Sequence, residues 1–121
     1  FSPLAQGFLS NKYLSNIPKG TRVSENSSFD KTLITKSNIK TINELNLIAK
    51  KRGQSLSQMA LAWVLNNKAV TSALIGVRTI QQLKENIEAL KNLKFSKSEL
   101  SEINKKAKEG NINLWSPSSA H

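Results

Sequence analysis

Four short patterns place a serine or threonine three residues before a glutamate or glutamine: Thr41-x-x-Glu44, Ser55-x-x-Gln58, Thr79-x-x-Gln82 and Ser96-x-x-Glu99. In such a capping box the hydroxyl accepts a hydrogen bond from the amide three residues on, and the Glu or Gln side chain reaches back to the amide of the cap residue. Each pattern here heads a run with apolar residues at helical spacing. The sequence therefore predicts four helices.

The apolar positions within these runs predict which faces are buried. The first helix carries Ile42, Leu45, Ile48 and Ala49 on one face, and we expect it to end at Gly53 after the basic run 50–52. The second, near residues 56–65, is apolar on most sides, so we expect it to be largely buried, Trp63 included. The third and fourth have apolar stripes, formed by Ile80, Leu83, Ile87 and Leu90 and by Leu100, Ile103 and Ala107, and the fourth ends at Gly110.

Two further segments resemble strands. Residues 70–77 are short and mostly small or apolar without strict alternation, which is typical of a strand buried on both faces of a parallel sheet. Residues 1–9 are expected to be the end of a buried strand that runs into a turn, and the polar stretch 11–40 has loop composition. The order of elements predicts an α/β fold. Because two strands leave sheet edges unpaired, we expect the missing strands to lie N-terminal to Phe1.

Charge and composition narrow the function classes. The chain of 121 residues has 18 Lys and Arg against 8 Asp and Glu, a net charge of +10 that favours an anionic partner. With no cysteine, disulfides, thiol catalysis and Cys-based zinc sites are excluded, and we expect no metal site and a cytoplasmic location. No apolar run is long enough for a membrane span, so no membrane partner is expected.

One helix start has the features of a phosphate site. Gly76 ends the predicted strand, Arg78 follows, and the capping box at Thr79 begins a helix at once. Free amides at a helix N-terminus bind phosphate, and an arginine fork pairs with it. An alternative is that Gly76 is a turn residue and Arg78 is simply exposed. The stretch 2–7 with Lys12 beyond it has the same two interpretations.

These motifs together resemble the C-terminal part of an aldo-keto reductase. The matching residues are Ser2-Pro-Leu-Ala-x-Gly7, Lys12-Tyr13, Ile17-Pro18 with Arg22, Gly53 before Gln58-Met-Ala-Leu-Ala-Trp63, and Ile75-Gly76 before Gln82-Leu83-x-Glu85-Asn86. The resemblance covers almost the whole chain. It is closest to the branch that holds bacterial L-glyceraldehyde 3-phosphate (methylglyoxal) reductases and potassium-channel β-subunits, and Asn113-Leu114-Trp115 is similar to the bacterial reductases in particular.

The resemblance implies a fold and a cofactor. Residues 1–121 would be the C-terminal portion of a single (β/α)₈ TIM barrel, about its last two βα units plus a terminal helix and tail, with residues 13–40 as a long loop over the cofactor. The cofactor would be NADPH or NADP⁺, and the substrate a small carbonyl compound. The implied cofactor-binding residues are Phe1, Ser2, Pro3, Leu4, Ala5, Gln6, Lys12, Arg22, Gly76, Arg78, Gln82, Glu85 and Asn86.

Two positions depart from the channel subunits, which carry Ser in place of Arg78 and Tyr in place of Gly20. An arginine at position 78 is expected to favour NADPH over NADH.

No residue of this chain is expected to be catalytic. The family's catalytic Asp, Tyr, Lys and His come from the first half of the barrel, and neither Tyr13 nor His121 matches them. The resemblance implies that the complete protein reduces small aldehydes or ketones by hydride transfer, and that this segment alone is inactive. It leaves a homo-oligomer open.

Two other functions stay open. One is a non-catalytic, NADPH-sensing regulatory subunit. The other is a basic nucleic-acid-binding module, which ranks well below because the basic residues are spread along the chain and are not interleaved with aromatic ones, so we expect no nucleic acid as a partner.

Overall fold

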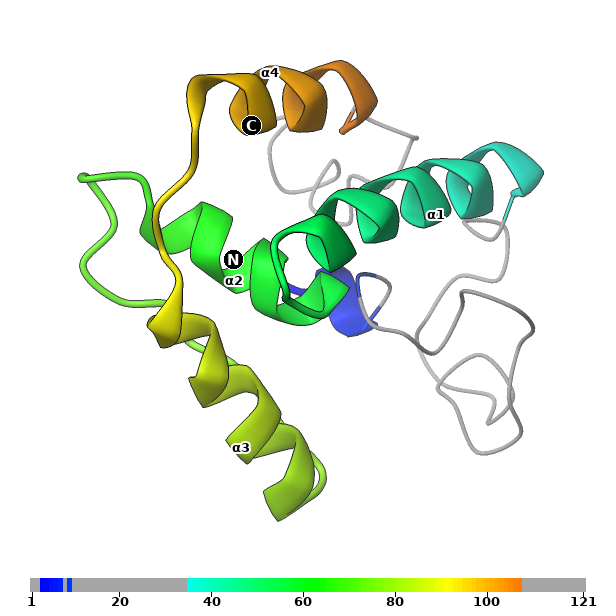
Figure 1. Cartoon of the computed structure of the whole chain (residues 1–121). Coiled ribbons are helices and arrows are strands. Elements are labelled where there is room, and N and C mark those ends of the chain that lie inside the picture. Colours follow the sequence, from blue (N-terminus) through cyan, green and yellow to red (C-terminus); the bar gives the residue numbers. More distant parts are fainter. Residues whose placement is uncertain (1–2, 8, 10–34, 108–121) are drawn as a thin grey trace, which may run out of the picture.

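The computed structural model describes residues 3–7, 9 and 35–107. The elements in chain order are the 3₁₀ helix η1 (Ala5–Gly7), the helices α1 (Lys36–Lys51), α2 (Leu56–Leu65) and α3 (Ile80–Ile87), the 3₁₀ helix η4 (Glu88–Lys91), and α4 (Lys97–Lys106). Helix α1 contacts both α2 and α4, whereas α3 and η4 contact α2. Figure 1 shows α3 projecting away from α1 and α4 as an arm.

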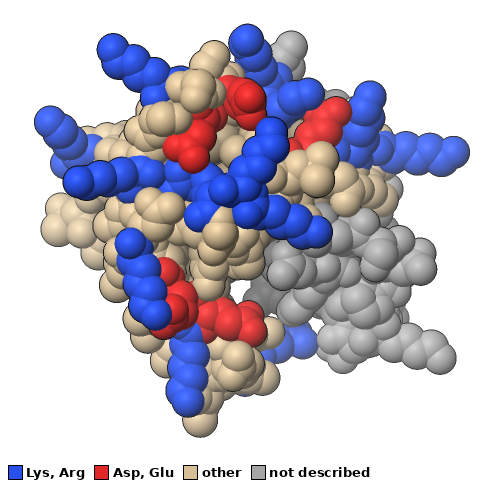
Figure 2. Space-filling view, viewed as in Figure 1, with Lys and Arg blue, Asp and Glu red and all other residues tan. Residues whose placement is uncertain are grey.

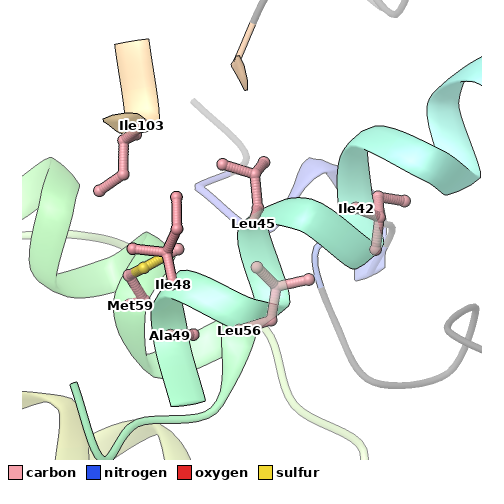
Figure 3. Packing of buried hydrophobic residues seen from close by; sticks show 7 residues of the cluster. All are labelled: Ile42, Leu45, Ile48, Ala49, Leu56, Met59 and Ile103. Atoms are coloured by element: carbon pink, nitrogen blue, oxygen red, sulfur yellow. The ribbon is translucent and has the colours of Figure 1, made fainter. Parts of the chain in front are cut away.

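The hydrophobic core lies between α1, α2 and α4. The predicted apolar face of α1 is buried there, which confirms the periodicity argument for this helix. Leu56 and Met59 of α2 and Ile103 of α4 complete the cluster, and Figure 3 shows their side chains converging on α1. Ala5 and Phe95 pack against its edge. Three helices thus bury one continuous apolar surface.

Two of the predicted capping boxes are complete. At α2 the Ser55 hydroxyl accepts from the Gln58 amide (3.2 Å) while the Gln58 side chain accepts from the Ser55 amide (2.9 Å). At α4 Ser96 and Glu99 make the same pair of bonds, at 3.1 and 2.7 Å. Helix α2 has the predicted bounds, while α4 ends at Lys106, and Gly110 lies outside the described residues.

The predicted start of the first helix is wrong. Helix α1 begins at Lys36, because the Thr35 hydroxyl caps it by accepting from the Asn38 amide (3.0 Å). The residues between this cap and Thr41 include no proline or glycine that would stop a helix. Residues 36–40 of the predicted loop therefore belong to α1, and residues 10–34 lie outside the described part of the chain.

The end of α1 confirms the role expected of Gly53. This glycine has φ of +70°, a left-handed conformation that costs a side-chain-bearing residue energy. Its amide donates to the Lys50 carbonyl, and the Gln54 amide donates to the Ala49 carbonyl, both at 3.0 Å. The two bonds form a Schellman turn, which satisfies carbonyls left without partners at the helix end.

The prediction of a strand at residues 70–77 is wrong. The segment is irregular, and its Leu74 side chain is 92% exposed. In residues 1–9 the described positions form a 3₁₀ turn at Ala5–Gly7, and none of them is a strand. A strand needs a neighbour for its backbone hydrogen bonds, and the described part of the chain supplies none.

The prediction of burial is also wrong for several apolar residues outside the core. Trp63 is 45% exposed on α2, although the apolar run predicted that it would be buried. Helix α3 forms as predicted, but its stripe of Ile80, Leu83, Ile87 and Leu90 is exposed. The apolar periodicity predicted the helix correctly. The described residues, however, leave its apolar stripe exposed.

Candidate functional site

The start of α3 is organised by two side chains. The Thr79 hydroxyl accepts from the Gln82 amide (3.1 Å), as the capping pattern predicts. The Gln82 side chain, however, accepts from the amide of Arg78 (2.9 Å), one residue before the cap. The backbone directly before α3 is therefore held by a hydrogen bond between Arg78 and Gln82, two residues of the predicted site.

Gly76 and Arg78 lie on an open surface just before this helix start. Both are exposed, and a Cβ added at Gly76 would meet no atom within 4 Å. Helix N-termini carry partial positive charge, and the guanidinium of Arg78 adds a full one. The charge and openness of this segment fit a phosphate group.

Glu85 and Asn86 lie in the last turn of α3. The Glu85 carbonyl accepts from Gln58 Nε2 of α2 (2.8 Å), and its carboxylate accepts from Gln81 Nε2 (3.2 Å). Asn86 is only 9% exposed, and it is the buried residue of α3. Gln82, Glu85 and Asn86 thus share one short helix, as expected.

The predicted site residues near the N-terminus lie elsewhere. Pro3, Leu4 and Ala5 are half-buried, and the Leu4 carbonyl accepts from the amides of Gly7 and Leu9, at 2.9 and 3.2 Å. Figure 1 places this turn beside α1 and α2, whereas α3 begins at the far end of the projecting arm. The structure therefore does not bring the two groups together.

Several predicted positions lie outside the described residues. These are Phe1, Ser2, Lys12 and Arg22, and only the backbone of Gln6 is described. Tyr13 and His121, for which no catalytic role is expected, lie outside the described residues as well. Among the residues that are described, no group of three or more His, Cys, Asp or Glu could hold a metal ion.

Sequence reasoning missed Arg52, whose side chain has several partners among the described residues. Its side chain is 2% exposed and forms an ion pair with Glu99 (3.0 Å). It donates to Gln54 Oε1 (3.0 Å) and to two carbonyls of the connection between η4 and α4, those of Asn92 (3.3 Å) and Lys94 (3.0 Å). The basic run 50–52 suggested only a complement to the helix dipole. In the sequence, Arg52 differs from Lys50 and Lys51 in standing directly before Gly53, the glycine of the Schellman turn.

The surroundings of Arg52 also explain the acidity of Glu99. The backbone amide of Ser96 donates to the Glu99 carboxylate, and with the nearby guanidinium of Arg52 it holds the pKa of Glu99 below its ordinary value, against the opposing effect of burial. The Phe95 ring lies under the same guanidinium, 3.7 Å from Arg52 Cζ to the ring centroid. This cluster fastens α4 and its preceding connection to the end of α1.

A sequence model described as the aldo/keto reductase family matches residues 1–108. The chain belongs to the aldo/keto reductase family. It is similar to proteins named L-glyceraldehyde 3-phosphate reductase from Escherichia coli O157:H7 (42% identical) and from Escherichia coli strain K12 (43%), each over 98% of this chain. It is also 35% identical, over 74% of its length, to a putative voltage-gated potassium channel subunit beta of Schizosaccharomyces pombe.

Membership in the aldo/keto reductase family implies a (β/α)₈ barrel. The chain spans 36% of the length of the two bacterial reductases and 27% of the fission-yeast protein. The helical structure of the described residues is consistent with part of such a barrel. None of the helices described here is long and apolar enough to cross a membrane.

Proposed function

We propose that this chain is the NADPH-binding, C-terminal portion of an enzyme that reduces small aldehydes or ketones, such as glyceraldehyde 3-phosphate or methylglyoxal. Family membership and the similarity to two bacterial L-glyceraldehyde 3-phosphate reductases support an oxidoreductase. The observation that carries the cofactor assignment is the exposed Gly76–Arg78 segment directly before the capped start of α3. We also propose that the protein acts in the cytoplasm.

In this proposal the residues around α3 bind the adenosine end of the nucleotide. Gly76 leaves room for a phosphate to approach the backbone, and Arg78 pairs with the 2′-phosphate that distinguishes NADPH from NADH. Gln82, Glu85 and Asn86, which share α3, hold the adenosine. The bound cofactor supplies the hydride. The role of these residues is to hold and orient the cofactor.

The catalytic step is assigned to the remainder of the barrel, N-terminal to Phe1. Two exposed apolar surfaces support this partner: the stripe on α3, and segment 70–77 with its Leu74. Exposed apolar stripes of this kind mark surfaces that another element covers. The remainder of the barrel would supply the neighbouring strands and the proton donor, so we expect the 121 residues alone to show no turnover.

The test is the affinity of the full natural protein for NADPH and NADH, measured by fluorescence titration. Because charge-assisted hydrogen bonds contribute about 1.5–3 kcal/mol, Arg78→Ala should weaken NADPH binding at least about tenfold and leave NADH binding nearly unchanged. Lys84→Ala removes an exposed charge from α3 itself, the helix that follows Arg78, and serves as the control. Equal NADPH affinity in Arg78→Ala and the unmodified protein would contradict the assignment.

Two alternatives are weaker. The similarity to a putative potassium channel subunit beta supports a non-catalytic, NADPH-sensing subunit, but over less of the chain and at lower identity. Carbonyl reduction by the full natural protein would exclude it. For a nucleic-acid-binding module, Figure 2 shows basic side chains scattered over the visible face with acidic ones among them, and not gathered into one stripe. Salt-dependent retention on a polyanion, without NADPH binding, would favour that module.

A further inference from the structure

Helix α3 and η4 form an arm that contacts α2 and carries an apolar stripe. The stripe is exposed, and the buried residues of the arm are Asn86 and Ala89. Apolar burial against the neighbouring helices is therefore small on this arm. Polar contacts help to position it: one from α2 to α3, and others from Arg52 and Gln54 to Asn92, the residue that caps η4.

One of these contacts comes from Gln58 in the first turn of α2. Its Oε1 accepts from the Ser55 amide (2.9 Å) and so closes the capping box of α2. Its Nε2 donates to the Glu85 carbonyl of α3 (2.8 Å). A side-chain amide accepts on one atom and donates from the other, whereas an ionised carboxylate only accepts. Glutamate at this position would therefore satisfy the capping box but not the contact with α3.

The acceptor in α3 is a group that needs a partner. Glu85 lies three residues before Glu88, the C-terminal cap of α3. The last four carbonyls of an α-helix receive no hydrogen bond from an amide of the same helix, so another group must donate to them. The amide of Gln58 performs this role, and it fixes the last turn of α3 to the first turn of α2.

We propose that Gln58 is a positioning residue for nucleotide binding. By holding the Glu85 carbonyl it sets the orientation of the turn that carries the Glu85 and Asn86 side chains, two of the residues assigned to the adenosine. This inference rests on the proposed function, because it assigns Gln58 a role at that same site. Gln58 itself does not contact the cofactor in this proposal.

The test compares Gln58→Glu with Ser55→Ala in the full natural protein. Gln58→Glu keeps the acceptor for the Ser55 amide but removes the donor to Glu85, so the KM for NADPH should rise about three- to tenfold while kcat changes less than about twofold. Ser55→Ala breaks the same capping box from its other side and leaves the side-chain amide of Gln58 in place. It should lower the unfolding midpoint and leave the KM for NADPH near that of the unmodified protein.

The outcomes are distinguishable. An unchanged KM in Gln58→Glu, or an equal rise in Ser55→Ala, overturns the role of Gln58 and leaves the proposed function intact. If the unmodified protein does not bind NADPH, the proposed function fails and the role of Gln58 toward the nucleotide fails with it. Hydrogen exchange of the nucleotide-free protein gives an independent readout, because the α3 amides should exchange faster in Gln58→Glu than in Ser55→Ala.

Discussion

Arg52 Nη1 lies 3.0 Å from Glu99 Oε2, so an ion pair joins the residue that ends α1 to the first turn of α4. The same guanidinium donates to the carbonyls of Asn92 and Lys94 and stacks over Phe95. The buried Arg52 side chain therefore holds the connection after η4, the Phe95 ring and the first turn of α4 against the end of α1. A second pair between α1 and α4, Lys106 with Glu44, is more exposed.

Replacing Arg52 should destabilise the protein far more than replacing Lys106. Arg52→Met removes the guanidinium that pairs with Glu99 and donates to the carbonyls of Asn92 and Lys94. Glu99 keeps the Ser96 amide and the Asn92 carbonyl keeps Gln54 Nε2 as donors, but the lost ion pair and hydrogen bonds should still cost about 2–4 kcal/mol in the free energy of unfolding. Lys106→Ala removes an exposed pair and should cost less than about 1 kcal/mol. Urea denaturation of both variants measures the difference, and similar midpoints would show that the Arg52 cluster contributes little.

The lowered pKa of Glu99 predicts a loss of stability in acid. Because the carboxyl binds protons less readily in the folded state, the unfolded chain takes up more protons below the ordinary glutamate pKa of about 4.3. Stability from this group is therefore present above that pH and is lost as pH falls through the lower folded pKa. Glu99→Gln cannot titrate, so its stability should fall less steeply between about pH 5 and 3. Parallel curves for the two proteins would contradict this prediction.

The stripe on α3 predicts a contact with the rest of the protein. In the full natural chain, Leu83→Asp should lower the free energy of unfolding by at least about 2 kcal/mol, because a charge would enter an apolar contact. Gln81→Asp introduces the same charge off the stripe, where it replaces an exposed hydrogen bond to Glu85 with a like-charge pair, so it should cost less than about 1 kcal/mol. Thermal unfolding separates the two variants. Equal stability would mean that no element covers the stripe.

Local signals in the sequence predicted local structure well. Ser55 with Gln58, Ser96 with Glu99, and Gly53 each specify hydrogen bonds within a few residues, and the structure contains these bonds. The start of α1 was missed because Thr35 provides an earlier cap without a Glu or Gln three residues on. Whether Thr35 or Thr41 caps the helix depends on which hydroxyl has a backbone amide within reach. Residue types alone do not determine this.

Features that depend on distant partners were not predictable. Residues 70–77 have strand composition, but strand formation requires a paired neighbour, which the described residues lack. The burial of Arg52 depends on carbonyls about 40 residues away, at Asn92 and Lys94, and no spacing rule connects these positions. For the candidate site, the sequence predicted that Gln82, Glu85 and Asn86 share a helix, but not that Gln58 would hold that helix.

The bonds from Arg52 to the connection between η4 and α4 end on backbone carbonyls, at residues 92 and 94. Every amino acid presents the same carbonyl, so these two contacts place no demand on which side chains stand at the two positions. Related chains can therefore vary freely at residues 92 and 94 and still keep the connection in place. A change in the length of the connection, by contrast, would move both carbonyls away from the guanidinium.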